Sequence, residues 1–215
     1  MITIGCAGFA VPATRYFKEY AFVEIQETAL GTPGQGTLRR WKREAPEGFE
    51  FALLAPKEIA QEAFRSGRVV TDALGRLQEV AVELAATTAV FLAPPEFPAS
   101  KPNRAALRDF LGLARERFAT VVFDAGPGWA PDEADQLAEE AGALAARDPL
   151  VAGVSARPVS YYRLPGPAGR KSRYEDPAIE RLAEIANANT EQQARYVFAN
   201  VDMFTDAGRF RRLLS

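Results

Sequence analysis

The strongest constraint on the fold is a regular alternation along the chain. Short runs rich in β-branched and aromatic residues, such as Ile2–Cys6 and Phe22–Ile25, are each followed by a longer segment with helical periodicity. The clearest helix runs from Thr71 to about Ala86, where Leu74 and Leu77 begin an apolar face. This alternation is typical of parallel βα units, so we expect an α/β protein.

The number of strands favours a barrel over an open sheet. Eight strands alternating with helices predict one TIM-barrel-like (β/α)8 domain over residues 1–215, with an open doubly wound sheet as the alternative. Only Ala156–Pro158 separates the sixth and seventh strands. A parallel crossover needs about a dozen residues, so we expect the barrel to be irregular there. The expected strands lie at residues 2–6, 22–25, 49–54, 89–92, 120–123, 150–154, 159–164 and 196–198.

Two local features complete this prediction. Residues 59–70 give no clear periodicity and are expected to be irregular. Asn103 is expected to cap the helix that carries Leu107 and Phe110, since an asparagine side chain accepts hydrogen bonds from the first backbone amides of a helix.

The composition excludes several kinds of site. The chain has no histidine, which rules out imidazole-based catalytic triads and histidine-rich metal sites. Acid–base chemistry must then use Asp, Glu, Lys, Tyr or Cys. Cys6 is the single cysteine, so no intrachain disulfide forms, and we expect its side chain to be a small buried hydrophobe rather than a nucleophile.

Charge and hydropathy limit the binding partners and the location that the sequence predicts for this protein. The net charge is −2 and no wide basic stripe is present, which argues against nucleic-acid binding. The N-terminus has neither a basic n-region nor a long apolar run, so no signal peptide or membrane span is predicted and the cytoplasm is the expected location. No cofactor is predicted, and the sequence leaves the oligomeric state open.

Several short segments together resemble the YecE-like family, domain of unknown function number seventy-two. Their order and spacing, rather than any single motif, carry the resemblance. They are IGCAGF at 4–9, VEI at 23–25, FEFA at 49–52 with Lys57, Phe91 with Pro94 and Pro95, Trp129, YRL at 162–164 with Gly166 and Tyr174, and YVF at 196–198 with Asn200.

The resemblance implies a TIM-barrel-like fold with a pocket at the C-terminal ends of the strands. The family has no established activity. The chain departs from the family pattern after the second strand, where Ala29 and Leu30 replace an aromatic–arginine pair, and at Gln61 and Leu92. These departures suggest a member that has lost chemistry its relatives perform.

In a barrel, residues at the C-terminal ends of the strands converge on one face. Glu24 and Lys57 are expected to be the catalytic pair, because an ammonium group keeps a neighbouring carboxylate ionised. Arg163 and the backbone amides near Gly166 are expected to bind an anionic group, with Tyr174, Asn200 and Asp124 as further ligand-binding residues. The whole set gathered by this rule is Cys6, Glu24, Lys57, Asp124, Arg163, Asn200 and Asp202.

Each residue also has a structural interpretation. Glu24 is equally expected to pair with a neighbouring basic residue, and Lys57 to be a solvated loop residue. The carboxylates of Glu24, Asp124 and Asp202 are suitable for Mg²⁺, but barrel mouths are generally polar and no metal is predicted. The run Arg170–Arg173 is expected to be a solvated loop, because no interleaved aromatic residues support a nucleic-acid surface.

Three functional hypotheses follow. The first is an enzyme, or former enzyme, acting on a small anionic molecule held by Arg163, with Glu24 as base and Lys57 as electrostatic stabiliser. The second is a non-catalytic binding or scaffold protein that keeps the barrel and its anion pocket. Nucleic-acid processing has the least support.

Overall fold

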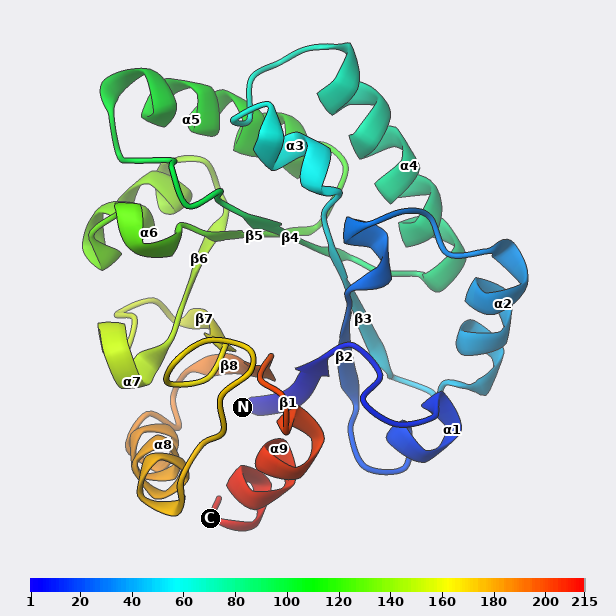
Figure 1. The fold of residues 1–215 in the computed structure, drawn as a ribbon, viewed down its shortest axis with the longest axis vertical. Coiled ribbons are helices and arrows are strands. Elements are labelled where there is room, and N and C mark those ends of the chain that lie inside the picture. The colour runs from blue at the N-terminus through cyan, green and yellow to red at the C-terminus, as the bar shows by residue number, and fades with distance from the viewer. Residues whose placement is uncertain (215) are drawn as a thin grey trace. The chain divides into compact units, whose positions relative to one another are not determined.

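A computed structural model of the chain describes residues 1–214. Its strands follow one another in sequence order, β1 to β8, around a closed barrel (Figure 1). Neighbouring strands such as β1 and β8, or β4 and β5, are parallel. The closed order confirms the (β/α)8 prediction. The strands are β1 Ile2–Ala7, β2 Phe22–Ile25, β3 Glu50–Leu54, β4 Thr88–Leu92, β5 Thr120–Asp124, β6 Leu144–Arg147, β7 Val159–Leu164 and β8 Gln193–Phe198.

Helices connect the strands. Two of the connections also contain a single 3₁₀ turn, η1 Glu27–Ala29 after β2 and η2 Gly126–Gly128 after β5. The α-helices described within residues 1–214 are α1 Ala13–Tyr16, α2 Gln35–Glu44, α3 Lys57–Gln61, α4 Arg68–Leu84, α5 Lys101–Arg115, α6 Pro131–Glu140, α7 Pro149–Ala152, α8 Asp176–Ala188 and α9 Met203–Arg212.

The chain divides into two compact units, which we describe one at a time. Unit 1 comprises Met1–Glu24, Pro46–Glu50 and Ala146–Ser215. Unit 2 comprises Ile25–Ala45 and Phe51–Ala145. That residues 1–215 behave as a single domain stays a prediction.

In unit 1, β1 lies between β2 and β8, and β7 pairs with the other edge of β8. Helix α9 packs against β1 and β8 and lies beside α8 (Figure 1). The strands approach closely at Gly5, because a Cβ atom at this position would lie 2.3 Å from the carbonyl oxygen of Phe22. Only glycine therefore fits the central position of β1 opposite the Phe22 ring.

Unit 2 has its own apolar core. Helix α4 buries a continuous apolar face that includes Leu74, Leu77 and Leu84, and α5 buries Leu107 and Phe110. Helix α4 runs from Arg68 to Leu84, three residues earlier at its start than the sequence predicts. It ends at Ala85, whose left-handed backbone, φ 52°, closes the last turn.

Three local predictions were wrong. Residues 150–154 do not form the sixth strand: Pro149–Ala152 is helix α7, and β6 lies earlier, at Leu144–Arg147. Asp148 explains the difference, since its Oδ1 accepts a hydrogen bond from the amide of Leu150 at 2.9 Å and caps the helix. The β6–β7 connection therefore runs over residues 148–158 and contains the single helical turn α7, in place of the three residues that the sequence predicted.

The other two corrections concern helix starts. Ser100, not Asn103, caps α5, and its Oγ accepts from the amide of Asn103 at 3.4 Å. Within 59–70, which was expected to be irregular, the chain completes α3 at Gln61 and begins α4 at Arg68. For α5, the proline at its second position explains why the helix starts before Asn103: the amide hydrogen that proline lacks is not needed in the first turn of a helix.

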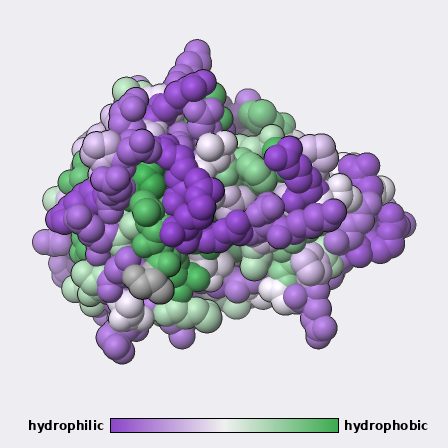
Figure 2. All heavy atoms as spheres, turned by 90° about the horizontal axis from the view of Figure 1, so that it is seen from below, coloured by the Kyte–Doolittle hydropathy of each residue, from purple (hydrophilic) through white to green (hydrophobic). Residues whose placement is uncertain are grey.

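No helix within residues 1–214 has both the length and the apolar composition that crossing a bilayer requires. Figure 2 shows one face of the molecule, on which hydrophilic residues cover most of the surface and a narrow band of hydrophobic residues lies between them. Scattered apolar surface of this kind is usual for folded proteins.

Candidate ligand-binding site

A buried ion pair lies at the C-terminal ends of β2 and β7 in unit 1. The Arg163 Nη2 donates to Glu24 Oε1 at 2.7 Å, and its Nε donates to both carboxylate oxygens at 3.1 and 3.2 Å. The Tyr161 hydroxyl donates to Glu24 Oε2 at 2.7 Å. Glu24 is fully buried, and the Arg163 side chain is only 10% exposed. Both oxygens of this carboxylate are thus already hydrogen-bonded.

The strand period explains how these groups meet. Tyr161 and Arg163 are two residues apart on β7 and so point to the same face, as Phe22 and Glu24 do on β2. The Phe22 and Tyr161 rings also contact each other edge to face, with centroids 6.3 Å apart. Burial, and then the Glu24 charge, raise the pKa of Tyr161 well above its usual value, so its hydroxyl stays protonated and donates to Glu24.

The loop after β7, residues 165–175, is closed by its own contacts. The amide of Gly166 donates to the Tyr174 hydroxyl at 2.9 Å. Gly166 has φ 97°, and a Cβ atom there would lie 2.5 Å from Ser172 Oγ, so the turn requires glycine. The amide of Ala168 donates to the same Ser172 oxygen at 3.0 Å. Both amides therefore have partners within the loop.

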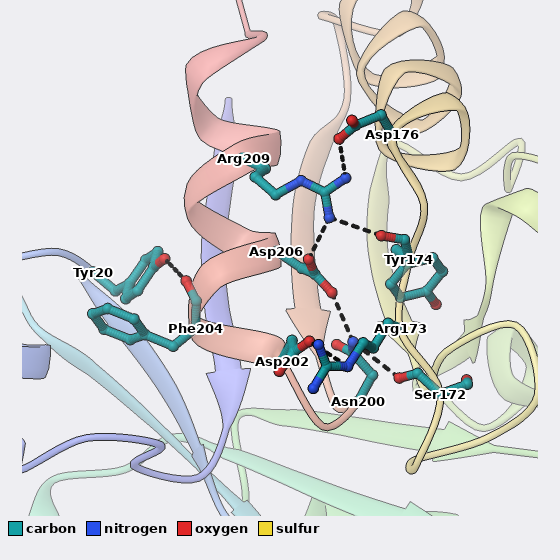
Figure 3. Close-up of polar contacts among 10 residues, drawn as sticks. All are labelled: Tyr20, Ser172, Arg173, Tyr174, Asp176, Asn200, Asp202, Phe204, Asp206 and Arg209. Carbon is teal, nitrogen blue, oxygen red and sulfur yellow. Dashed lines mark hydrogen bonds and ion pairs between the residues drawn. The ribbon is translucent and has the colours of Figure 1, made fainter.

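Asn200, which follows β8, lies in a polar network that joins the loop to α9 (Figure 3). Its Nδ2 donates to Asp206 Oδ2 at 2.7 Å. Arg209 then donates to Asp206 Oδ1 at 2.6 Å and to the Tyr174 carbonyl at 2.8 Å, and it pairs with Asp176. The network ties the end of the loop to the last helix. The Asn200 Oδ1 is buried, and none of the residues 1–214 donates a hydrogen bond to it.

Unit 2 contains a pocket of about 170 Å³ at the C-terminal ends of β3 and β4. Helix α3 and the residues after β2 and β4 complete its wall. Lys57, the first residue of α3, is the single charged residue among those that line it; its side chain is exposed and forms no ion pair with any of the residues 1–214. The apolar wall includes Ala29, Leu54, Ile59, Phe64, Phe91 and Leu92.

Asp124 ends β5, also in unit 2. Its Oδ1 accepts from the amide of Gly126 at 3.3 Å and so supports the following 3₁₀ turn. Trp129, which closes this turn, donates from its ring nitrogen to the carbonyl of Phe97 at 2.9 Å. Asp124 does not line the pocket that contains Lys57.

The predicted site residues therefore fall into separate groups. Glu24 contacts Arg163, and Gly166 contacts Tyr174. Asn200 donates directly to the Ser172 carbonyl of the same loop at 3.4 Å as well as to Asp206 of α9. The partners described for Glu24 are Arg163 and Tyr161, and its predicted pairing with Lys57 stays a prediction. Within residues 1–214, no group of three or more acidic, cysteine or histidine side chains is arranged to hold a metal ion.

Cys6, near the end of β1, is fully buried. Burial raises the pKa of its thiol to about 12, and its backbone amide donates to the Tyr16 hydroxyl at 2.7 Å. The thiol is therefore protonated at neutral pH.

Sequence reasoning missed Tyr161, Asp206 and Phe64. Tyr161 had a usable signal, because it stands two residues before Arg163 on the same strand. Asp206 and Arg209 have the spacing of neighbours on one helix face, i and i+3. No sequence signal indicated Phe64, because it lies in the segment 59–70, which has no clear periodicity.

Comparison with known proteins agrees with this fold. A DUF72 family protein from Enterococcus faecalis V583 superposes with a TM-score of 0.79 at 16% identity, covering 100% of this chain and 95% of that chain. A DUF72 family protein from Thermotoga maritima MSB8 gives 0.74 at 16% identity, over 99% and 98%. A xylose isomerase domain containing protein from Salmonella typhimurium LT2 gives 0.67 at 11%, over 98% and 95%.

These identities are low, so the superpositions establish the barrel fold alone. No curated protein matches the chain. The family model described as "Protein of unknown function DUF72" matches residues 13–215, nearly the whole sequence, and confirms the resemblance drawn from the short segments. The chain belongs to the DUF72 family.

Proposed function

We propose that the protein binds a small organic anion with an apolar portion, and that the pocket at the ends of β3 and β4 holds it. The observation that carries the proposal is the pocket itself, an apolar hollow of about 170 Å³ with Lys57 at its edge. Small-molecule sites are mostly apolar and contain a few polar groups that fix orientation. The C-terminal ends of barrel strands are also where ligands bind in this fold.

The charge of Lys57 specifies the ligand. An apolar wall contributes affinity for hydrocarbon, and a single ammonium group adds a preference for a carboxylate or another anionic group. Lys57 is one of the residues that line the pocket, and its side chain is exposed and forms no ion pair within residues 1–214. A ligand carboxylate would therefore meet a cation that no protein carboxylate already neutralises.

The other predicted anion site is less suited to this role. An anion at Arg163 would compete with Glu24, which already receives three hydrogen bonds from the same guanidinium. The Gly166 amide likewise already donates to Tyr174. We therefore assign Arg163, Gly166, Tyr174 and Asn200 to holding the barrel and its loop.

This assignment also bears on catalysis. A base needs a free lone pair directed at its substrate, and both Glu24 oxygens accept hydrogen bonds from Arg163 while one also accepts from Tyr161. The proposal is thus a binding function, in which Glu24 holds the barrel together. It places this function in the cytoplasm, as the sequence predicts.

Isothermal titration and thermal shift with benzoate, phenylacetate, acetate and inorganic phosphate test the proposal. The two aromatic carboxylates should bind the wild-type protein, and phosphate should not. Lys57→Met should weaken their binding about two- to fivefold, as expected for one solvated ion pair. Lys42→Met is the matched control, since Lys42 is exposed on α2 and does not line the pocket. Equal affinities for wild type and Lys57→Met, or no carboxylate binding at all, would contradict the proposal.

A further inference from the structure

The chain leaves α3 through an unusual backbone turn. The amide of Phe64 donates to the carbonyl of Ile59 at 3.1 Å, and that of Ala63 donates to Ala60 at 2.9 Å. These two hydrogen bonds define a Schellman motif, a common helix ending. In this motif the residue at the position of Ala63 is usually glycine. Here Ala63 has φ 49° and Phe64 has φ 60°.

Two consecutive left-handed residues that are not glycine are costly. The left-handed region brings Cβ close to the following carbonyl oxygen, and for a bulky side chain such as phenylalanine it is a genuine outlier. Within residues 1–214 the one other such residue is Ala85, which ends α4. Strain of this kind persists only where the surrounding structure fixes the side chain, and it occurs frequently at ligand sites.

The surrounding structure does fix Phe64. Its ring is buried among the rings of Phe97, Phe110 and Phe123, at centroid distances of 5.2, 5.2 and 5.7 Å. Edge-to-face and tilted contacts of this kind hold a ring in one orientation. Phe64 is also one of the residues that line the pocket containing Lys57. The turn and the aromatic cluster together thus fix Phe64 in one orientation at the wall of the pocket.

The volume of the pocket indicates the size of the apolar group that it can hold. An engineered protein cavity of about 150 Å³ lined by leucine, isoleucine and phenylalanine binds benzene. The present pocket, at about 170 Å³, has room for one group of that size and little more. Two fused rings would have to displace the Phe64 ring or extend into solvent.

The geometry points to Phe64 as the residue that sets ligand size: the pocket favours an anion whose apolar part is one six-membered ring, or a group of equal volume, and binds larger ones less tightly. The inference rests on the proposed function, because it concerns the same pocket. It adds the substrate class, a monocyclic carboxylate, and the side chain that selects it.

Titration of benzoate and 2-naphthoate against wild type and Phe64→Leu tests the inference. Wild type should bind benzoate at least about tenfold more tightly than 2-naphthoate, within the range of discrimination that apolar pockets achieve. Phe64→Leu should abolish or reverse that preference. Phe118→Leu is the matched control: it makes the same change at a buried phenylalanine of unit 2 that neither lines the pocket nor contacts the Phe64 ring, and it should keep the wild-type preference.

Phe64→Met provides a second variant if Phe64→Leu does not fold. Methionine fills a similar volume but is flexible, so the preference for benzoate should fall while the fold is retained. If neither carboxylate binds wild type, the proposed function itself fails. If benzoate binds wild type and the size preference is the same in wild type, Phe64→Met and Phe118→Leu, the inference alone is wrong.

Discussion

Arg163→Met should be among the most damaging substitutions in unit 1. Glu24 is fully buried, and the guanidinium of Arg163 supplies three of the hydrogen bonds described for its carboxylate. Removing one partner of a buried ion pair leaves an uncompensated charge and costs about 3–5 kcal/mol. For a chain of this length, each kcal/mol lowers Tm by about 2–4 °C. The variant should therefore melt roughly 6–20 °C below wild type.

A double variant separates the charge effect from the loss of packing. Glu24→Leu combined with Arg163→Met replaces the pair by apolar groups, a change that is often neutral or stabilising. The double variant should therefore be more stable than Arg163→Met alone. Arg181→Met is the matched control, because Arg181 and Glu184 form a surface ion pair in which both side chains are 66% exposed. Its loss should cost less than about 1 kcal/mol.

Urea unfolding followed by tryptophan fluorescence and by circular dichroism measures these differences. Coincident transitions from both probes justify two-state free energies. The reasoning is refuted if Arg163→Met loses less than about 1 kcal/mol of unfolding free energy, or if the double variant is no more stable than Arg163→Met alone. Either result would mean that the Glu24 charge is compensated elsewhere.

Two further predictions concern β1. Gly5→Ala should lower the free energy of unfolding by about 3 kcal/mol or more in urea, since a Cβ atom would lie 2.3 Å from the Phe22 carbonyl oxygen; a loss below about 0.5 kcal/mol would show that the strands separate without cost. The second concerns the Cys6 thiol, whose pKa is raised by burial from 9.0 to about 12. The folded protein keeps this proton where the unfolded chain loses it, so stability is full below pH 9 and falls as the pH rises toward 12. Between pH 8 and 10.5, wild type should lose roughly 2 kcal/mol more than Cys6→Ala, and equal losses would contradict the assignment.

Most of the barrel follows from local pattern. The run Val159–Leu164 is β-branched and aromatic, and the structure places β7 at these residues. Residues 150–154 misled the analysis because leucine and valine favour strands, whereas Asp148 and Pro149 provide a helix cap and a suitable first residue. The true β6, Leu144–Arg147, contains two alanines and so resembles the end of a helix.

The site was less predictable because its contacts are distant in sequence. Glu24 and Arg163 are 139 positions apart, and no local pattern selects Arg163 over Lys57 as the partner of Glu24. The convergence of strand ends in a barrel predicted that Glu24 and Arg163 lie at the same face, but it did not predict the ion pair between them. Phe64 was not predicted for a different reason. A left-handed turn is normally indicated by glycine, and alanine, Ala63, occupies that position here.

The state of each cation distinguishes the two kinds of site. Arg163 and Arg209 are both bonded to acidic residues in unit 1, so their positive charges stabilise the fold and are unavailable to a ligand without breaking it. Lys57 forms no such pair among residues 1–214 and stands at the edge of an apolar pocket. A ligand that reaches Lys57 therefore has to displace only water, whereas one that reaches Arg163 has to displace a buried carboxylate. In the proposed function, the pocket after β3 and β4 therefore selects the ligand, while the charged residues of β2 and β7 maintain the barrel.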